Sequence, residues 1–473
     1  MKCPPLFFKF KALIILSLIN NGGLMSFNIQ LTLFYDLQYF IQTSPLHRKY
    51  YLIFKALDDS DLQKFNTGIG RNGYPKHTFL RAFIVKQLEG IKSVPKLIEF
   101  LQNHPIIANF CGFDHNKPLP DDSQFYRFLK KIKNSTLKNI VYSRNKKLIE
   151  KNIINLDIFI MDSKPILAST KENNPKNPRR NTTNKNKKPK RNPEATLSYF
   201  SYQLSSKDNS KQFFFFWGFR THVIISKEGI PLVEKTMPNN ASEVQVAKSL
   251  IQELKNIYHF KNKVIFIGDK GYDEKDLYDF IVKKMKAKAY IPLNKRNTKQ
   301  DKRFSEKGIP LCQANLEMAF NGMVKEKKRT RKKFRCPLKV NKKLKEKFPQ
   351  GCPVNNPKFF EGKQYGCTSY LDVTNDARAN VPRESEHFKQ TYKLRTEIER
   401  YFSRLGDREF EYTKHYNFKS IENQMTIAHL SLVLVAYVAA IFLENPQKIR
   451  SFSTFTLNLS ENEIDKIKEI LAA

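Results

Sequence analysis

The sequence is poor in cysteine, in long apolar runs, and in acidic residues relative to basic ones. Six cysteines spread unevenly over 473 residues do not make the disulfide framework of a secreted domain, so we expect a protein of the reducing cytoplasm. The apolar stretch 430–443 has only 14 residues, which suits a buried core helix rather than a membrane span. With no lipidation motif and no amphipathic basic helix, a membrane partner is not expected.

Positive charge is what the chain has in excess. It carries 83 Lys and Arg against 45 Asp and Glu, a net charge of +38. Solubility of a small domain needs a net charge of only about 2 to 8, so a basic surface kept for solubility is the weaker explanation. We expect a polyanionic partner, with nucleic acid ahead of any other.

The first residues resemble a signal-peptide core, because lysines precede the apolar run 12–19. No small-residue cleavage site follows, and Met25 stands just before a helical pattern. We therefore expect residues 1–24 to be a non-native or disordered leader, with translation starting at Met25.

Residues 25–150 are predicted to form a helical N-terminal domain. Apolar residues recur at helical spacing in KHTFLRAFIVKQLEGI (76–91), and PDDSQFYRFLKKI (120–132) predicts another helix. Between them, Ser93 and Pro95 mark a helix start. The role of this domain is either structural or to bind and position the ends of a DNA substrate.

From residue 151 the pattern changes to alternating strands and helices. Up to residue 300 we expect a strand bearing an acid, a hairpin joined at 227–229, a helix, a second acid-bearing strand, a helix and a further strand. This is the order of a ribonuclease-H-like mixed α/β sheet with helices on both faces. An insertion, 301–385, is expected to interrupt this core, 386–445 to complete it, and 446–473 to form a C-terminal tail helix.

Two apolar strands each deliver a carboxylate. LDIFIMDSKPI brings Asp162 and KVIFIGDKGYD brings Asp269 to the end of an apolar run. Two such acids on neighbouring strands repel each other and burial raises their pKa, so the pair is unfavourable without a cation. Mg²⁺ prefers oxygen ligands, and two ions about 3.5 to 4 Å apart support in-line phosphoryl displacement. Such a site needs a third acid.

The helix YKLRTEIERYFSRL (392–405) supplies the candidate. Tyr392, Arg395 and Glu399 share one helical face. Glu397 is turned away by about 200° and is expected to face solvent, so Glu399 is the better third ligand. The alternative is an ordinary surface pair of Arg395 with Glu399, worth about 0.3 to 0.5 kcal/mol.

Together these three motifs resemble insertion-sequence transposases of the DDE class, in the group whose third acid lies in a Tyr-x2-Arg-x3-Glu-x6-Lys helix. The similarity includes GYPKHTFLRAFIVKQLEGIKSVPKLIEFL and GFRTHV and runs from about residue 30 to 445. It implies that Asp162, Asp269 and Glu399 are the catalytic acids and hold two Mg²⁺ or Mn²⁺ ions. It also implies that Tyr392 and Arg395 position a phosphate near the transposon end.

The sequence departs from that pattern at the lysine, where Gly406 stands. The phosphate contact is then missing or passes to Arg404 or Arg408. The implied function is metal-dependent hydrolysis at the element ends, then strand transfer of the 3′-hydroxyl into target DNA, by at least a dimer assembled on double-stranded DNA in the nucleoid. Two alternatives remain: a nuclease of the same fold that only hydrolyses, and a DNA-binding descendant with a decayed site.

Two basic segments are candidates for DNA contacts. In the loop 171–195, residues 171–192 hold nine basic side chains and no aliphatic one, so a mobile loop along phosphates is expected, with Arg180 and Lys188 as contacts. In the insertion, thirteen of residues 325–347 are basic, and Arg329 and Lys332 are the expected contacts.

The insertion also holds the cysteines Cys312, Cys336, Cys352 and Cys367. Their spacings of 24, 16 and 15 residues differ from the close pairs of known zinc modules. Reduced buried thiols are therefore expected, and a structural Zn²⁺ is the alternative.

Three other residues are expected to be structural. Asp273, three residues before Asp276, resembles part of a helix N-cap pair. His222 is expected to be a core histidine with its hydrogen bonds satisfied. Trp217 is expected to pack in the core, with stacking on an extruded base as the alternative.

Overall fold

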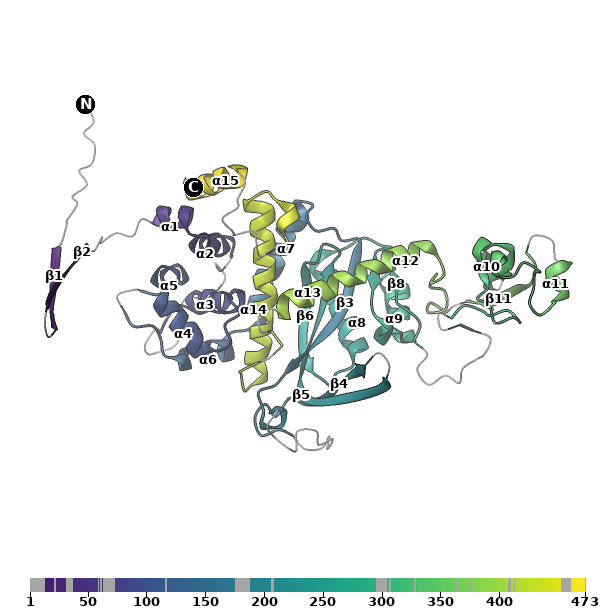
Figure 1. Cartoon of the computed structure of the whole chain (residues 1–473), viewed down its shortest axis with the longest axis horizontal. Helices are drawn as coiled ribbons and strands as arrows, with labels where there is room; N and C mark the ends of the chain where they lie inside the picture. The colour runs from purple at the N-terminus through teal and green to yellow at the C-terminus, as the bar shows by residue number, and fades with distance from the viewer. Residues whose placement is uncertain are drawn as a thin grey trace, which may run out of the picture.

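The computed structural model describes residues 13–20, 23–30, 37–57, 59, 62, 73–114, 117–174, 188–205, 208–294, 304–305, 308–326, 329–361, 365–374, 376–406, 410–411, 413–451 and 461–472. Figure 1 shows helices of the N-terminal region at one end, a mixed sheet in the centre, and a smaller lobe built from the insertion at the other end. The long helix α14 (Phe418–Tyr437) runs between the N-terminal helices and the sheet.

The described part of the chain begins with an antiparallel hairpin of β1 (Leu13–Asn20) and β2 (Gly23–Gln30). Met25 lies inside this hairpin, paired with Leu18. The expectation that Met25 stands just before a helix is therefore wrong, because Met25 lies in a strand and the first helix of the described residues begins at Leu37.

The predicted helices of the N-terminal region are present. Ser93 accepts a hydrogen bond from the backbone N–H of Lys96, and Pro95 lies in the first turn that follows, as the sequence indicated. The preceding helix was predicted from a stripe of apolar side chains, and two of these, Leu80 and Phe83, are buried. The helices described here are α1 (Leu37–Thr43), α2 (Pro45–Ala56), α3 (Lys76–Leu88), α4 (Val94–Asn103), α5 (Pro105–Cys111), α6 (Asp122–Lys131) and α7 (Asn134–Glu150).

The central sheet has the predicted ribonuclease-H-like order. Its strands are β3 (Ile158–Leu167), β4 (Thr196–Ser205), β5 (Asp208–Ser226), β6 (Pro231–Pro238), β7 (Ile265–Ile267) and β8 (Lys288–Tyr290). β3 pairs antiparallel with β5 and parallel with β7, while β5 pairs antiparallel with β6 and β7 parallel with β8. The resulting order is β6-β5-β3-β7-β8, and β4 adds along the first half of β5. The sequence did not predict β4.

Helices cover both faces of this sheet, as predicted. Successive residues of a strand point to opposite faces. On β5, Arg220 contacts Glu243 of α8 (Glu243–Tyr258), whereas the next residue, Thr221, contacts His429 of α14. The helices α8 and α14 therefore lie on opposite sides of the sheet.

The apolar stretch near the C-terminus is the core helix that was predicted. α14 continues into a π-helical turn at 438–442, and by length and composition alone the combined helix could cross a membrane, with a mean hydropathy of 2.2. In the structure, 89% of that apolar window is buried inside the protein, against α3, α6, α7 and β6 among others. This helix therefore forms a core shared by the helical region and the sheet.

The insertion forms an antiparallel sheet of its own, ordered β11-β10-β9. These strands are β9 (Ala319–Lys325), β10 (Thr330–Arg335) and β11 (Thr368–Asp372), and the short helices beside them are α10 (Lys342–Lys347) and α11 (Pro357–Phe360). This compact lobe was foreseen only as a basic, cysteine-containing segment.

After the insertion the chain returns to the sheet as a nearly continuous helical segment (Figure 1). It comprises α12 (Glu386–Tyr392), a 3-10 turn (Lys393–Arg395) and α13 (Thr396–Gly406), so the helix predicted over 392–405 is tightened at its start. The remaining helices named here are α9 (Lys275–Asp279), which follows β7, and α15 (Glu461–Ala472), which lies within the segment 446–473 predicted to form a tail helix.

Candidate active site

The parallel pairing of β3 with β7 brings the two strand acids side by side. Ile160 pairs with Ile267, so Asp162 and Asp269, each two residues further on, occupy equivalent positions on strands about 4.8 Å apart. Asp162 remains within β3. Asp269 begins the turn after β7, where its carboxylate accepts a hydrogen bond of 2.7 Å from the Gly271 N–H.

The carboxyl of Asp162 lies in surroundings that oppose its charge. Burial raises its pKa to about 7; a hydrogen bond from the Ser163 N–H and the charge of Arg395 act against the rise, and the charge of Asp269 adds to it. The approach of a cation favours the ionised form of such a group. The raised pKa that we expected for acids on neighbouring strands is thus present at Asp162.

Glu399 reaches the same place from α13. Its side chain is 58% exposed and pairs with Arg395 at 2.5 Å, and a second nitrogen of the Arg395 guanidinium lies 3.4 Å from Oδ2 of Asp162. Arg395 therefore connects the first and third acids, and its contact with Glu399 is more than an isolated surface pair.

Tyr392 lies beside all three acids. Burial raises the pKa of its phenol to about 12, and the nearby Arg395 charge opposes the rise. The carboxylates that raise it further are those of Asp269, Asp162 and Glu399. Together with the pairing of β3 and β7 and the contacts of Arg395, this places the acids at a common site joining β3, the turn after β7, and α13.

The donor chemistry of this site suits a hard divalent cation, which prefers carboxylate oxygens. Within the part of the chain that the structure describes, no set of three or more His, Cys, Asp or Glu side chains already stands in metal-holding geometry. At the acids, the Arg395 guanidinium contacts both Asp162 and Glu399. A cation shared by these two acids has to displace that guanidinium.

A lysine that the sequence did not single out lies on the same face of β3. Side chains two residues apart on a strand point the same way, so Lys164 lies on the same face as Asp162. Its ammonium is 5.9 Å from the ring centre of Phe402 on α13 and pairs at 2.6 Å with Glu411, which follows that helix. A side chain added at Gly406 would begin 3.8 Å from Nζ of Lys164. Lys164 thus lies next to the position of the missing lysine, and the strand period of two was the signal that could have found it.

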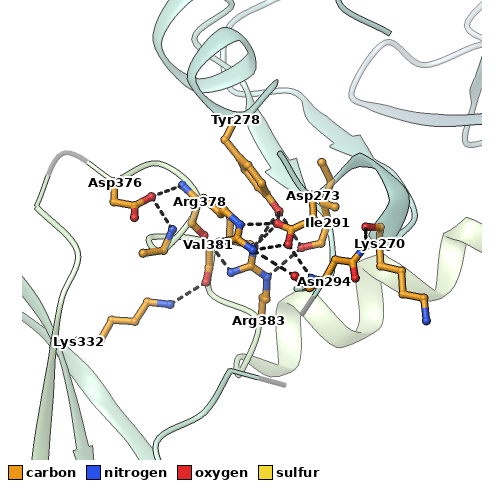
Figure 2. Close-up of polar contacts among 11 residues, drawn as sticks. Lys270, Asp273, Tyr278, Ile291, Asn294, Lys332, Asp376, Arg378, Val381 and Arg383 are labelled. Carbon is orange, nitrogen blue, oxygen red and sulfur yellow. Dashed lines mark hydrogen bonds and ion pairs between the residues drawn. The ribbon is translucent and has the colours of Figure 1, made fainter. Parts of the chain in front are cut away.

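Asp273 ties the turn after β7 to the segment that returns from the insertion (Figure 2). Its side chain is 0% exposed and accepts hydrogen bonds of 2.8 and 2.6 Å from Arg378 and one of 2.6 Å from the Asn294 N–H. Although burial opposes it, these hydrogen bonds hold the pKa of Asp273 below its ordinary value. The predicted helix-cap role is wrong, because Glu274 is the residue that precedes α9.

Comparison with known families assigns the chain. Residues 155–434 match the family described as a transposase DDE domain. The chain belongs to the DDE transposase family. The helices at the start of this transposase match a second family, described as a transposase domain (DUF772), over residues 38–131. The predicted resemblance to insertion-sequence transposases of the DDE class is therefore confirmed.

Other comparisons are weaker. A search of curated proteins finds no match to the transposase. Similar solved structures include a piggyBac transposase synaptic complex with hairpin DNA, with 10% identity, 93% of this chain and 82% of that chain covered, and a TM-score of 0.34. They also include the Mos1 mariner paired end complex with Mn, with 13% identity, 52% of this chain and 67% of that chain covered, and a TM-score of 0.16. Neither likeness is close enough to carry an argument about the transposase.

On the side of α13 that carries Glu397 and Arg404, the contacts differ from those predicted. Glu397 was expected to face solvent, but it is only 6% exposed and pairs with Arg400 and Arg450. Arg404, proposed above to contact DNA, donates instead to the carbonyl oxygen of Gly229 at 2.9 Å. The hairpin turn at Gly229 and the C-terminal segment at Arg450 both contact this side of α13, which explains the two differences, and helix periodicity alone does not reveal either.

The four predicted DNA contacts in the basic segments differ in environment. Arg180 lies outside the described residues, Lys188 is exposed, and Arg329 is exposed in an ion pair with a nearby glutamate. Lys332 is buried and its ammonium pairs with Glu384 at 3.1 Å. The structure therefore contradicts the prediction that Lys332 contacts DNA, because its charge is already used inside the protein.

His222 and Trp217 are both buried, as expected. The backbone of Trp217 exchanges hydrogen bonds with the side chain of Asn173, which fixes the start of the basic loop to β5. His222 departs from the prediction, because among the described residues neither of its ring nitrogens has a hydrogen-bond partner. Burial lowers its pKa to about 3, so it is a neutral core histidine whose hydrogen bonds are not satisfied.

Proposed function

We propose that this transposase hydrolyses the phosphodiester at the ends of its element in a metal-dependent reaction and transfers the released 3′-hydroxyl into target DNA. The observation that carries the proposal is the meeting of Asp162, Asp269 and Glu399 beside Tyr392 and Arg395. Two parallel strands and one helix supply oxygen donors at one place, which is what metal-assisted phosphoryl transfer needs.

The three acids would hold two Mg²⁺ or Mn²⁺ ions. The raised pKa of Asp162 supports this, because burial beside a second acid makes the ionised carboxylate unfavourable until a cation is bound. Bound ions would supply charge neutralisation at the scissile phosphate and activation of the attacking oxygen. Positioning and electrostatic stabilisation then account for the catalysis, and no covalent protein intermediate is needed.

Arg395 and Tyr392 would orient the DNA backbone. Arg395 is the natural candidate, since cations at the acids would release its guanidinium from Asp162 and leave it free to bind a phosphate oxygen in bidentate fashion. The phenol of Tyr392, whose pKa is raised to about 12, stays protonated and can donate a hydrogen bond to a phosphate oxygen.

Lys164 would supply the phosphate contact that Gly406 lacks. Its ammonium lies on the face of β3 that carries Asp162 and next to the open position at Gly406. We prefer it to Arg404 because Lys164, although paired with Glu411, lies on the strand of Asp162, whereas Arg404 is bound to the hairpin turn at Gly229; Arg408 lies outside the described residues. Lys164 on β3 would then supply the positive charge that the family pattern places at position 406, so the glycine there would not mean that the site has decayed.

DNA is the expected partner because the net charge of +38 favours a polyanion. The helices of residues 25–150 would bind the terminal inverted repeats, and Lys188 and Arg329 would contact phosphates elsewhere. Joining two element ends to one target requires at least two sets of acids, so we propose a dimer assembled on DNA in the cytoplasmic nucleoid.

The test is cleavage of a labelled duplex carrying the DNA that flanks the gene, in Mg²⁺ or Mn²⁺. Wild type should nick it at one defined position and leave a 3′-hydroxyl, Asp269→Asn should not, and Asp276→Asn, an exposed acid nearby, should behave as wild type. Cleavage with no joining to a second duplex would favour the nuclease. Binding without cleavage by folded wild type would favour the decayed DNA-binding protein.

A further inference from the structure

Four cysteines that are far apart in the sequence surround one small cavity in the lobe formed by the insertion. Cys312, Cys336, Cys352 and Cys367 all line it, and all four are free thiols. Their sequence spacings gave no sign of this, because the sheet and turns of the lobe, not local motifs, bring them together.

Strand pairing fixes two of the four. Cys336 directly follows β10 and Cys367 directly precedes β11, and Arg335 pairs with Thr368 in the antiparallel ladder. The two cysteines therefore leave neighbouring strands at the same end of the ladder, where the N–H of Cys336 donates to the carbonyl oxygen of Tyr365. The chain is packed closely here, since a Cβ added at Gly366 would lie 3.0 Å from Cβ of Cys336.

Tight turns surround the cavity, and in one of them backbone N–H groups are directed at a cysteine sulfur. The sulfur of Cys336 accepts hydrogen bonds from the N–H groups of Leu338 and Lys339. Cys312 and Cys352 each begin a turn whose fourth residue is an asparagine that donates its N–H to the cysteine carbonyl and has a positive φ. N–H groups directed at a sulfur favour its thiolate form.

The thiols nevertheless hinder one another's ionisation. Burial raises the pKa of both Cys336 and Cys367, and the neighbouring cysteines raise it further. Without a cation the thiols therefore stay protonated and neutral, whereas a bound cation would favour their thiolate forms. Thiolates are the preferred ligands of soft or borderline cations such as Zn²⁺ rather than of Mg²⁺.

Among the described residues of the lobe, the buried apolar core is small. Its buried apolar side chains, such as Met318, Phe334 and Leu338, are not part of the main hydrophobic core of the described chain. Units this small usually need disulfides or a structural metal to be stable, and disulfides do not persist in a reducing cytoplasm.

We propose that Cys312, Cys336, Cys352 and Cys367 bind one Zn²⁺ as a tetrahedral structural site that stabilises the insertion lobe. The described side chains do not yet stand in metal-holding geometry, so binding requires the thiols to rotate into the cavity they already line, to Zn–S distances of about 2.3 Å. This site is separate from the acids and does not depend on the proposed reaction.

The experiment uses the full chain, purified under reducing conditions and dialysed against a weak chelator, with zinc measured by elemental analysis. Wild type should retain one zinc per chain. Replacing that zinc with Co²⁺ should give the intense near-ultraviolet charge-transfer band of cobalt bound to thiolates. The cobalt measurement needs no variant, so it remains decisive if the variants fold poorly.

The double variant Cys336→Ser, Cys352→Ser should lose zinc to background. Two controls should keep it: Cys111→Ala, a buried cysteine in the helical region, and Asp269→Asn, which separates this site from the acids. No retained zinc in wild type, a cobalt spectrum without the thiolate band, or zinc kept by the double variant would overturn the proposal. A mass lower by two hydrogens per bridge under reducing conditions would show disulfides instead and overturn it equally.

Discussion

Replacing Asp162 with asparagine should stabilise the metal-free protein at alkaline pH. The pKa of Asp162 is about 7 in the folded protein against an ordinary value of 3.8. Between those values the folded protein keeps a proton that the unfolded chain has lost. The contribution of this proton to stability is therefore complete below about pH 4 and is lost as the pH rises through 7.

The size of the effect follows from the same two values. Each tenfold change in a protonation constant is worth about 1.4 kcal/mol, so the full loss is about 4 kcal/mol, of which about 3 kcal/mol falls between pH 5 and pH 8. Asparagine has the same shape and no charge to lose. The free energy of unfolding of Asp162→Asn minus that of wild type should therefore rise by up to about 3 kcal/mol between these pH values.

The assay is urea unfolding without divalent metal, followed through the fluorescence of Trp217, the single tryptophan, which is buried in the same sheet. Mg²⁺ added at pH 8 should stabilise wild type and leave Asp162→Asn unchanged. Asp157→Asn is the matched control, since that acid precedes the same strand and is 55% exposed. A difference between Asp162→Asn and wild type that is the same at pH 5 and pH 8 would refute the reasoning, because Asp162 would then carry no charge penalty.

Three further predictions concern the surroundings of the site. Arg378→Gln should lower the free energy of unfolding by about 2 to 3 kcal/mol. This is less than the roughly 3 to 5 kcal/mol expected for breaking a fully buried ion pair, because a second arginine, Arg383, remains near Asp273. Adding Asp273→Asn should recover part of the loss, and denaturant titration of both variants checks this. Burial lowers the pKa of His429 from 6.5 to about 3, so its neutral form stabilises the fold fully above pH 6.5 and this contribution is lost as the pH falls. Between pH 7 and pH 5 the free energy of unfolding of His429→Gln should therefore fall by about 2 kcal/mol less than that of wild type. An equal fall in both proteins would contradict this. Lys164→Ala should lower the rate of DNA cleavage by about tenfold or more, and Gly406→Lys in the same chain should restore it in the duplex assay; failure of the added lysine to restore cleavage, with folding intact, would remove Lys164 from the phosphate contact.

The sequence was most informative where a short local pattern determines the structure. The apolar runs that end at Asp162 and Asp269 predicted both strands, and the register of β3 with β7 now places these acids at equivalent positions. Ser93 caps the helix it was expected to cap. These features depend on neighbours a few residues away, so alternation and capping chemistry were sufficient to find them.

Features that depend on distant segments were missed or wrong. Glu397 was expected in solvent because helix periodicity cannot show that Arg450 packs against it. Asp273 has the sequence environment of a helix cap, but Arg378, 105 residues away, provides its hydrogen bonds. The cavity lined by the four cysteines likewise exists only once the strands of the insertion have paired. In each case a long-range ion pair or ladder decided the outcome, and neither leaves a periodic signal.

The contacts of Arg395 suggest how the metal-free site tolerates its own charge. Without a divalent cation, the guanidinium lies against Asp162 and Glu399, so the protein supplies an internal counter-ion to two of its three acids. Metal binding at these acids, as proposed, would replace one cation by another and, near neutral pH, would also release the proton that Asp162 retains there. Metal affinity should therefore rise with pH up to about 7. Arg395, if displaced by the metal, would then be free to bind a phosphate. Arg395 would thus have two roles: it neutralises the acids while no metal is bound, and it binds the DNA backbone once metal is bound.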